Sequence, residues 1–146
     1  MSKAETAVKF FDNYNCAQSV LAAYAADYDL EKDKALQIAV GFGAGMGRLQ
    51  KTCGAISGAI AVLGLSSGFK EEDRRDKINV VYAKVRRFVE EFTGEKGTVK
   101  CLDLLGGCDL SSEEGQKYFK EHNLKDKCRE YVRLCCELLD KYLAES

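Results

Sequence analysis

The chain has 146 residues, of which 46% are hydrophobic and 31% are charged, and its formal net charge is −1 at pH 7. This length fits one domain and is sufficient to bury a core without disulfide staples. The balance of 22 basic and 23 acidic residues excludes the broad positive field that attracts nucleic acid or an anionic membrane. We therefore expect neither as a partner.

The first half of the chain predicts helices that end at glycines, because it has no proline and no strand-like alternation of hydrophobic residues. Ser2–Glu5 is a capping box that begins the first helix, which is expected to bury Val8, Phe10 and Phe11. Three further helices are expected over Cys16 to about Ala26, about Asp33 to Met46, and Cys53–Leu63, the last breaking near Gly64 and Gly68.

The second half begins with the longest predicted helix, from about Glu71 to Phe92, whose hydrophobic residues recur at helical spacing. Gly94 and Gly97 are expected to end it. Further helices are expected over Val99–Leu105, from the capping box Ser111–Glu114 through Phe119, and from about Lys127 to Leu143. Without a linker or a repeat, residues 1–146 predict a single compact all-α domain of about seven or eight helices.

The location of the protein is predicted from two segments. The polar N-terminus, Met1–Glu5, lacks the apolar run of a signal peptide, which favours a cytoplasmic protein. The uncharged stretch Thr52–Phe69 is rich in glycine, serine and threonine and is closely bracketed by lysines. A membrane span needs about 20 predominantly apolar residues, so this stretch predicts a buried helix instead.

The unusual feature of the composition is its seven cysteines. Their number is odd and no secretion signal is evident, which argues against a disulfide framework. In a reducing cytosol such cysteines more often bind metal, carry out redox chemistry or fill the core. No C-x-x-C is present, which disfavours both a thioredoxin-type site and a zinc ribbon.

Four of the cysteines are predicted to lie in the first turn of a helix. They are Cys16, Cys53, Cys101 and Cys128, behind the expected N-caps Asn15, Thr52, Thr98 and Asp126. Free backbone amides and the helix dipole favour an anion there and lower the pKa of a thiol below its ordinary value of about 8.5. The thiolate is the form that binds metal or attacks a disulfide. The alternative is that each of these side chains is a small buried hydrophobe.

The remaining cysteines and the single histidine have simpler interpretations. Cys108 either turns back toward Cys101 as a resolving thiol or extra ligand, or is a plain loop residue. Cys135 and Cys136 are neighbours on a helix, point about 100° apart, and are expected to fill the core. His122 is expected on the surface, which leaves little support for histidine-centred acid–base catalysis.

The glycines around Cys53 predict close packing rather than nucleotide binding. The series Gly41–Gly47 fails the G-x-G-x-x-G pattern, and no strand precedes it. Gly54 and Gly58, with Gly43 and Gly47 on the preceding helix, are expected to let helices approach closely. This close packing would hold the start of the helix expected over Cys53–Leu63 against the backbone of neighbouring segments.

Five segments of the chain resemble the C_GCAxxG_C_C family of redox-active proteins. They are Asn15–Leu21, Gly41–Gly47, Thr52–Gly58, Cys101–Gly106 and Lys127–Val132, and the likeness extends from about Val8 to Leu139. One departure is local, because Thr52 replaces the glycine before Cys53 and Gly54 separates that cysteine from Ala55. The resemblance implies a redox or iron–sulfur role, and the four family cysteines correspond to Cys16, Cys53, Cys101 and Cys128.

The leading hypothesis is electron transfer through a metal centre, an iron–sulfur cluster, that is bound by these four thiolates. Zinc bound by the same sulfurs would be structural and redox-silent. A second hypothesis is a metal-free thiol–disulfide oxidoreductase that uses the same cysteines as redox-active thiols. A third is a helical interaction module with structural cysteines. The sequence does not identify the redox partner protein, and it is compatible with a homodimer.

Overall fold

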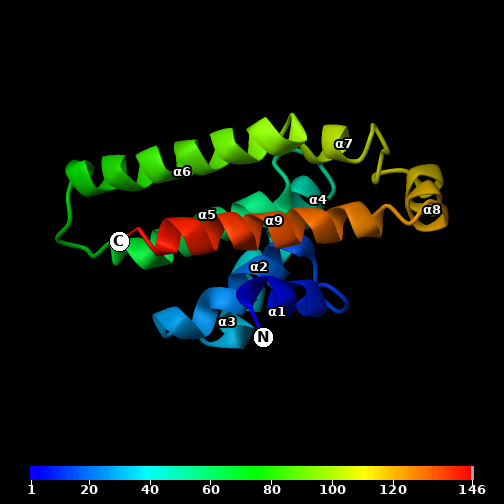
Figure 1. The fold of residues 1–146 in the computed structure, drawn as a ribbon. Coiled ribbons are helices and arrows are strands. Elements are labelled where there is room, and N and C mark those ends of the chain that lie inside the picture. Colours follow the sequence, from blue (N-terminus) through cyan, green and yellow to red (C-terminus); the bar gives the residue numbers. More distant parts are fainter. Residues whose placement is uncertain (146) are drawn as a thin grey trace.

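The computed structural model describes residues 1–145 and confirms a compact all-α fold (Figure 1). Its α-helices are α1 (Lys3–Phe10), α2 (Cys16–Ala25), α3 (Lys32–Ala39), α4 (Gly43–Met46), α5 (Gly54–Ser67), α6 (Arg75–Lys96), α7 (Cys101–Leu104), α8 (Glu113–Glu121) and α9 (Lys125–Leu143). Short 3-10 helices follow α2, at Ala26–Tyr28, and α3, at Val40–Phe42. Across residues 1–145, no helix combines the length and the apolarity that crossing a bilayer requires.

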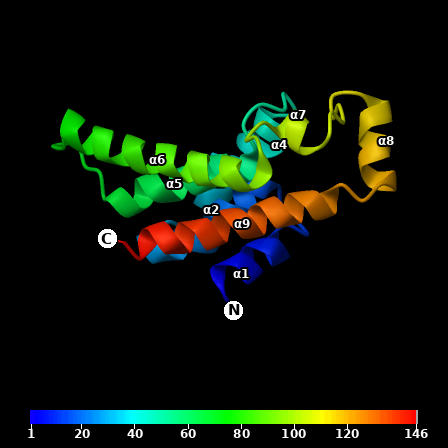
Figure 2. The same ribbon diagram turned by 45° about the horizontal axis from the view of Figure 1, so that its top comes forward.

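The long helices define the shape of the molecule. α5, α6 and α9 run lengthwise, α1 to α3 pack along one side, and α7 and α8 lie toward one end, with α4 beside α7 (Figures 1 and 2). The core lies where α2, α5 and α9 meet, and its largest fully buried side chains include Tyr24, Phe88, Phe92 and Tyr142. In α1 the buried positions are Ala4, Ala7 and Phe11, whereas Val8 and Phe10 are only half-buried at its edge.

The contact between α2 and α5 depends on two glycines, as the sequence predicts. A Cβ atom on Gly54 would collide with the sulfur of Cys16 and would lie 2.9 Å from the carbonyl oxygen of Phe42. A Cβ atom on Gly58 would lie 2.7 Å from the carbonyl oxygen of Ala17. The first turn of α5 therefore lies directly against the start of α2.

The helix predicted from Asp33 to Met46 is wrong in its second half. α3 ends at Ala39, and residues 44–50 follow a left-handed path with positive φ at Ala44, Gly45, Met46, Gly47, Arg48 and Gln50. The turn closes on itself, because the amide of Gln50 donates to Ala44 and the amide of Lys51 donates to Gly45. We call residues 43–50 the left-handed loop. Gly47 contributes conformational freedom rather than helix packing. Gly43 lies against the Asn15 side chain, and Gly45 combines a positive φ with a close approach to Cys101.

Other helix boundaries differ from expectation by one to a few residues. α5 continues through Gly64 and ends at Gly68, and α6 continues through Gly94 and ends at Gly97. A glycine inside a helix costs only about 1 kcal/mol, so packing can carry the helix past it. Gly68 and Gly97 do end helices, with left-handed φ values of 64° and 85°.

Candidate functional site

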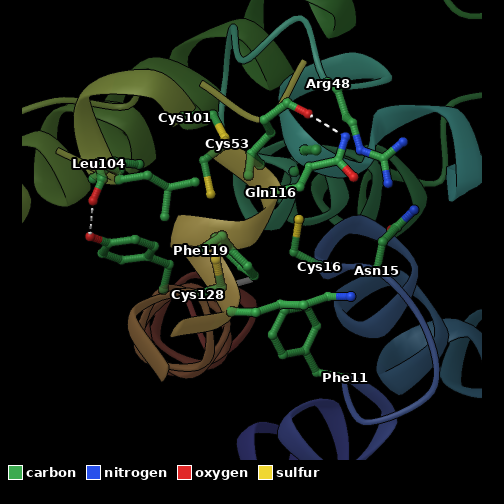
Figure 3. Close-up of a pocket in the computed structure, with 16 residues that line it drawn as sticks. Phe11, Asn15, Cys16, Arg48, Cys53, Cys101, Leu104, Gln116, Phe119 and Cys128 are labelled. Atoms are coloured by element: carbon green, nitrogen blue, oxygen red, sulfur yellow. Dashed lines mark hydrogen bonds between the residues drawn. The ribbon is translucent and has the colours of Figure 1, made fainter. Parts of the chain in front are cut away.

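The four cysteines that the sequence places at helix starts all line one cavity of about 280 Å³. Their sulfurs point toward its interior from four different segments of the chain (Figure 3). The apolar part of the wall consists of Phe11, Ala44, Leu104, Leu105, Leu110, Phe119 and Tyr131. The fold therefore brings together side chains that are separated by up to 112 positions (128 minus 16) in the sequence.

Cys16 is the first residue of α2, and its position is fixed by the capping box that the sequence predicts. The Asn15 side chain accepts from the amide of Gln18 at 2.9 Å, and the Gln18 side chain accepts from the amide of Asn15 at 3.0 Å. The Asn15 amide group also donates to the carbonyl of Val40 at 2.9 Å. This bond ties the start of α2 to the segment that leads into the left-handed loop.

Cys53 and Cys101 are positioned by a short antiparallel pairing between Thr52 and Lys100. The amide of Cys53 donates to Val99 at 2.8 Å, and the amide of Cys101 donates to Lys51 at 2.6 Å. This pairing explains why Thr52 and Thr98 are not the N-caps that the sequence predicts. Cys53 is itself the N-cap of α5, and Lys100, held in extended conformation, is the N-cap of α7.

Cys128 lies at the fourth position of α9 because that helix begins earlier than predicted. Leu124 is the N-cap, so the expected cap Asp126 lies inside the first turn and pairs with Arg129. The amide of Cys128 donates to Leu124 and is not free to face an anion. One turn later, the hydroxyl of Tyr131 donates to the carbonyl of Leu104 at 2.7 Å (Figure 3) and fixes α9 to α7.

The other three cysteines lie outside the cavity, and all seven are free thiols. Cys108 is buried, and its sulfur contacts the carbonyl oxygen of Gly115 at 3.2 Å. Cys135 and Cys136 are fully buried in the core, as the sequence predicts. His122 is exposed and stacks on Tyr118, as expected of a surface residue.

Burial raises the pKa of each thiol that lines the cavity. The pKa of Cys53 lies well above its ordinary value, that of Cys101 is raised to about 11, and that of Cys128 to about 12. The pKa of Cys16 is also raised, although the backbone amides of Ala44 and Ala17 act in the opposite direction. The expectation that helix starts lower these pKa values is therefore wrong, because desolvation outweighs the amides.

The four thiols also affect one another. Besides burial, negative charge on Cys16, Cys101 and Cys128 raises the pKa of Cys53, and charge on Cys16 raises those of Cys101 and Cys128. Such mutual repulsion is consistent with sulfurs that lie near one another in a poorly solvated region. The cavity can therefore hold several thiolates together only if a cationic group compensates their charge.

Three polar residues at the site have no signal in the sequence pattern. Gln50 is buried, donates to the carbonyl of Cys108 at 2.7 Å and accepts from the amide of Leu110 at 2.8 Å, which fixes one wall. Arg48 and Lys120 are exposed cations at the cavity, and no aspartate or glutamate in residues 1–145 lines it. These roles depend on tertiary contacts, which no local spacing encodes.

The thiols stand around the wall of the cavity instead of meeting at one point. Within residues 1–145, no group of three or more histidine, cysteine, aspartate or glutamate side chains is arranged so as to hold a metal ion. A tetrahedral zinc site with Zn–S bonds of about 2.3 Å needs sulfurs ~3.8 Å apart. The observed arrangement thus leaves a volume, lined by sulfur and by apolar side chains, between the four thiols.

Comparison with known proteins gives a family and one distant relative. Residues 14–142 match the family model described as "Putative redox-active protein (C_GCAxxG_C_C)". The chain is also similar to an uncharacterised protein of Archaeoglobus fulgidus, with 29% identity over 131 residues that cover 85% of this chain and 81% of that protein. No solved structure matches the chain.

Proposed function

The chain belongs to the C_GCAxxG_C_C family of redox-active proteins, and from this premise we propose that it transfers electrons through a thiolate-bound metal centre. The ligands would be Cys16, Cys53, Cys101 and Cys128, and the centre an iron–sulfur cluster. One observation carries the proposal: these four thiols, from four separate segments, line the same cavity.

The donor set supports a cluster over a single zinc ion. Iron–sulfur clusters are usually held by four cysteine thiolates, and four are present here without a competing carboxylate in the described wall. The cavity that the sulfurs line has a volume of about 280 Å³, and a multinuclear group needs such a volume whereas a single ion does not. Glycine at position 54 preserves this space, because a side chain there would displace the sulfur of Cys16.

A bound cluster would supply a reversible one-electron couple, and the protein side chains would determine its environment. The backbone amides of Ala17, Ala44 and Ala55 that favour the thiolate of Cys16 would also stabilise the reduced, more negative state. Leu105 and Phe119 would contribute an apolar wall, and the exposed cation of Arg48 at the cavity would offset negative charge there.

Two observations weaken the alternatives. A thiol–disulfide enzyme needs an accessible thiolate near neutral pH, but burial raises the pKa of Cys101 to about 11 and that of Cys128 to about 12. An interaction module with inert cysteines gives no reason for four thiols to face one cavity. Metal binding tolerates a high thiol pKa, because the cation displaces the protons.

The test is purification without exposure to air, followed by a visible spectrum and assays of iron and acid-labile sulfide. We expect a brown protein that contains both, and loss of the colour when any one of the four cysteines is replaced by serine. Cys108→Ser is the matched control, because it makes the same replacement at a buried thiol outside the cavity. A colourless protein that contains zinc alone would refute the cluster, and one defined disulfide after mild oxidation would favour thiol chemistry.

A further inference from the structure

Exposed hydrophobic side chains are concentrated on one segment beside the cysteine cavity. Within the twelve residues from 38 to 49, five large hydrophobic side chains are exposed: Ile38, Val40, Phe42, Met46 and Leu49. The other exposed large hydrophobics in residues 1–145 are scattered over other segments, at Met1, Phe69, Val80, Tyr82 and Tyr118. Single exposed hydrophobics need no explanation, but a concentration of them marks a contact surface. We call residues 38–49 the apolar segment.

The apolar segment is also a wall of the site. Ala44 and Arg48 line the cavity, and a Cβ atom on Gly45 would lie 2.8 Å from the Cβ of Cys101. One side of the segment therefore contacts the cysteines, while its exposed side chains face solvent. A molecule bound to the exposed side chains would therefore contact a segment that forms part of the cavity wall.

The charge of this region has a single sign. Asp and Glu are absent from Lys34 through Lys70, whereas Arg48 and Lys51 are exposed next to the hydrophobic side chains. Neither cation forms an ion pair within residues 1–145. The surface thus combines hydrophobic side chains with uncompensated positive charge, although the whole chain has a formal net charge of −1.

We propose that the apolar segment is the docking surface for an acidic electron-carrier protein, whose carboxylates pair with Arg48 and Lys51 around an apolar contact. The proposal rests on the electron-transfer function proposed above and adds the class of partner. A small ligand would not need five exposed hydrophobic side chains. A second copy of this chain, paired through the same surface, would bring two positively charged surfaces together.

Calorimetric titration with an acidic plant-type [2Fe–2S] ferredoxin as the probe, at low ionic strength, tests the surface. Val40→Glu and Lys51→Glu are each expected to weaken binding about tenfold, because they add negative charge against an acidic partner. Val80→Glu is the matched control, since both valines are 57% exposed. Arg86→Glu on α6 controls for charge reversal, and both controls should bind within about twofold of the unchanged protein.

Three results of the titrations would overturn the docking proposal: no binding of the ferredoxin, equal losses of affinity in the test and control variants, or stronger binding of a basic c-type cytochrome. A fourth is a dimer in analytical sedimentation that Val40→Glu, but neither control variant, dissociates. The last would assign the surface to a second copy. Binding is measured without reference to the metal centre. If the purified protein contains no iron but Val40→Glu still weakens ferredoxin binding while Val80→Glu does not, the proposed function is refuted and the docking surface is retained.

Discussion

The contact between α5 and Cys16 can be tested with two substitutions in α5: Gly54→Ala, which alters the contact, and Gly64→Ala, which serves as the control. A methyl group on Gly54 would collide with the sulfur of Cys16 and reach within 2.9 Å of the Phe42 carbonyl oxygen. Nothing lies within 4 Å of the corresponding position at Gly64. The two changes add the same atoms to the same helix, but Gly54 is its first residue and Gly64 lies in its interior.

The expected effects have opposite signs. Alanine is favoured over glycine inside a helix by about 1 kcal/mol, so Gly64→Ala should raise the free energy of unfolding by up to that amount. Gly54 is the first residue of α5, where the interior preference for alanine does not apply in full. The overpacking cost of about 1–3 kcal/mol, which includes movement of a backbone carbonyl, therefore dominates there. A loss of this size corresponds to a fall in Tm of roughly 3–12 °C.

The assay is urea denaturation of both variants, with the iron content measured after purification without air. Gly54→Ala should be less stable than the unchanged protein and should lose bound iron, because Cys16 must move. Gly64→Ala should keep its iron and gain stability. If both variants gain stability and retain iron equally, the close contact between α5 and Cys16 does not exist as described.

Three further predictions follow from the pKa values and the buried hydrogen bonds. Above about pH 9 the free energy of unfolding of the metal-free protein should fall. The thiols of the unfolded chain ionise there, whereas the pKa of Cys101 in the folded protein is about 11. Urea denaturation at several pH values measures this, and an unchanged free energy of unfolding between pH 9 and 11 would contradict it. Tyr131→Phe should lower the free energy of unfolding by about 1–3 kcal/mol, because the Leu104 carbonyl loses its hydroxyl partner, and an unchanged urea midpoint would show that the bond contributes nothing. Gln50→Ala should lower the free energy of unfolding by about 2–4 kcal/mol, because it removes two buried hydrogen bonds, and should speed amide hydrogen exchange in residues 108–110; unchanged exchange would contradict this role.

The parts of the fold that sequence predicts well are those with local causes. The hydrophobic periodicity of α6 and the reciprocal hydrogen bonds of Asn15 and Gln18 depend on residues a few positions apart. The left-handed loop was not predicted, because hydrophobic residues from Ile38 to Met46 imitate a helical pattern. Its path depends on tertiary contacts, including the bond from Asn15 to Val40.

In the candidate site, too, some features follow from local sequence and others only from tertiary contacts. The positions of Cys16 and Cys101 at helix starts follow from local sequence, although the cap of Cys101 is Lys100 and not the predicted Thr98. The direction of the pKa shifts could not be predicted, because desolvation depends on how α9 and the left-handed loop close over the cavity. The support that Gln50 gives to residues 108–110 likewise arises from a contact between residues about 60 positions apart.

The walls of the cysteine cavity come from both early and late parts of the chain, and this has a consequence for how the protein matures. Helix α2 supplies Cys16, whereas α9 supplies Cys128 and Tyr131. A growing polypeptide therefore has no complete pocket until α9 has been synthesised and has docked. Incorrectly folded chains would lack Cys128 as the fourth ligand, so the proposed metal centre would bind only after folding is complete.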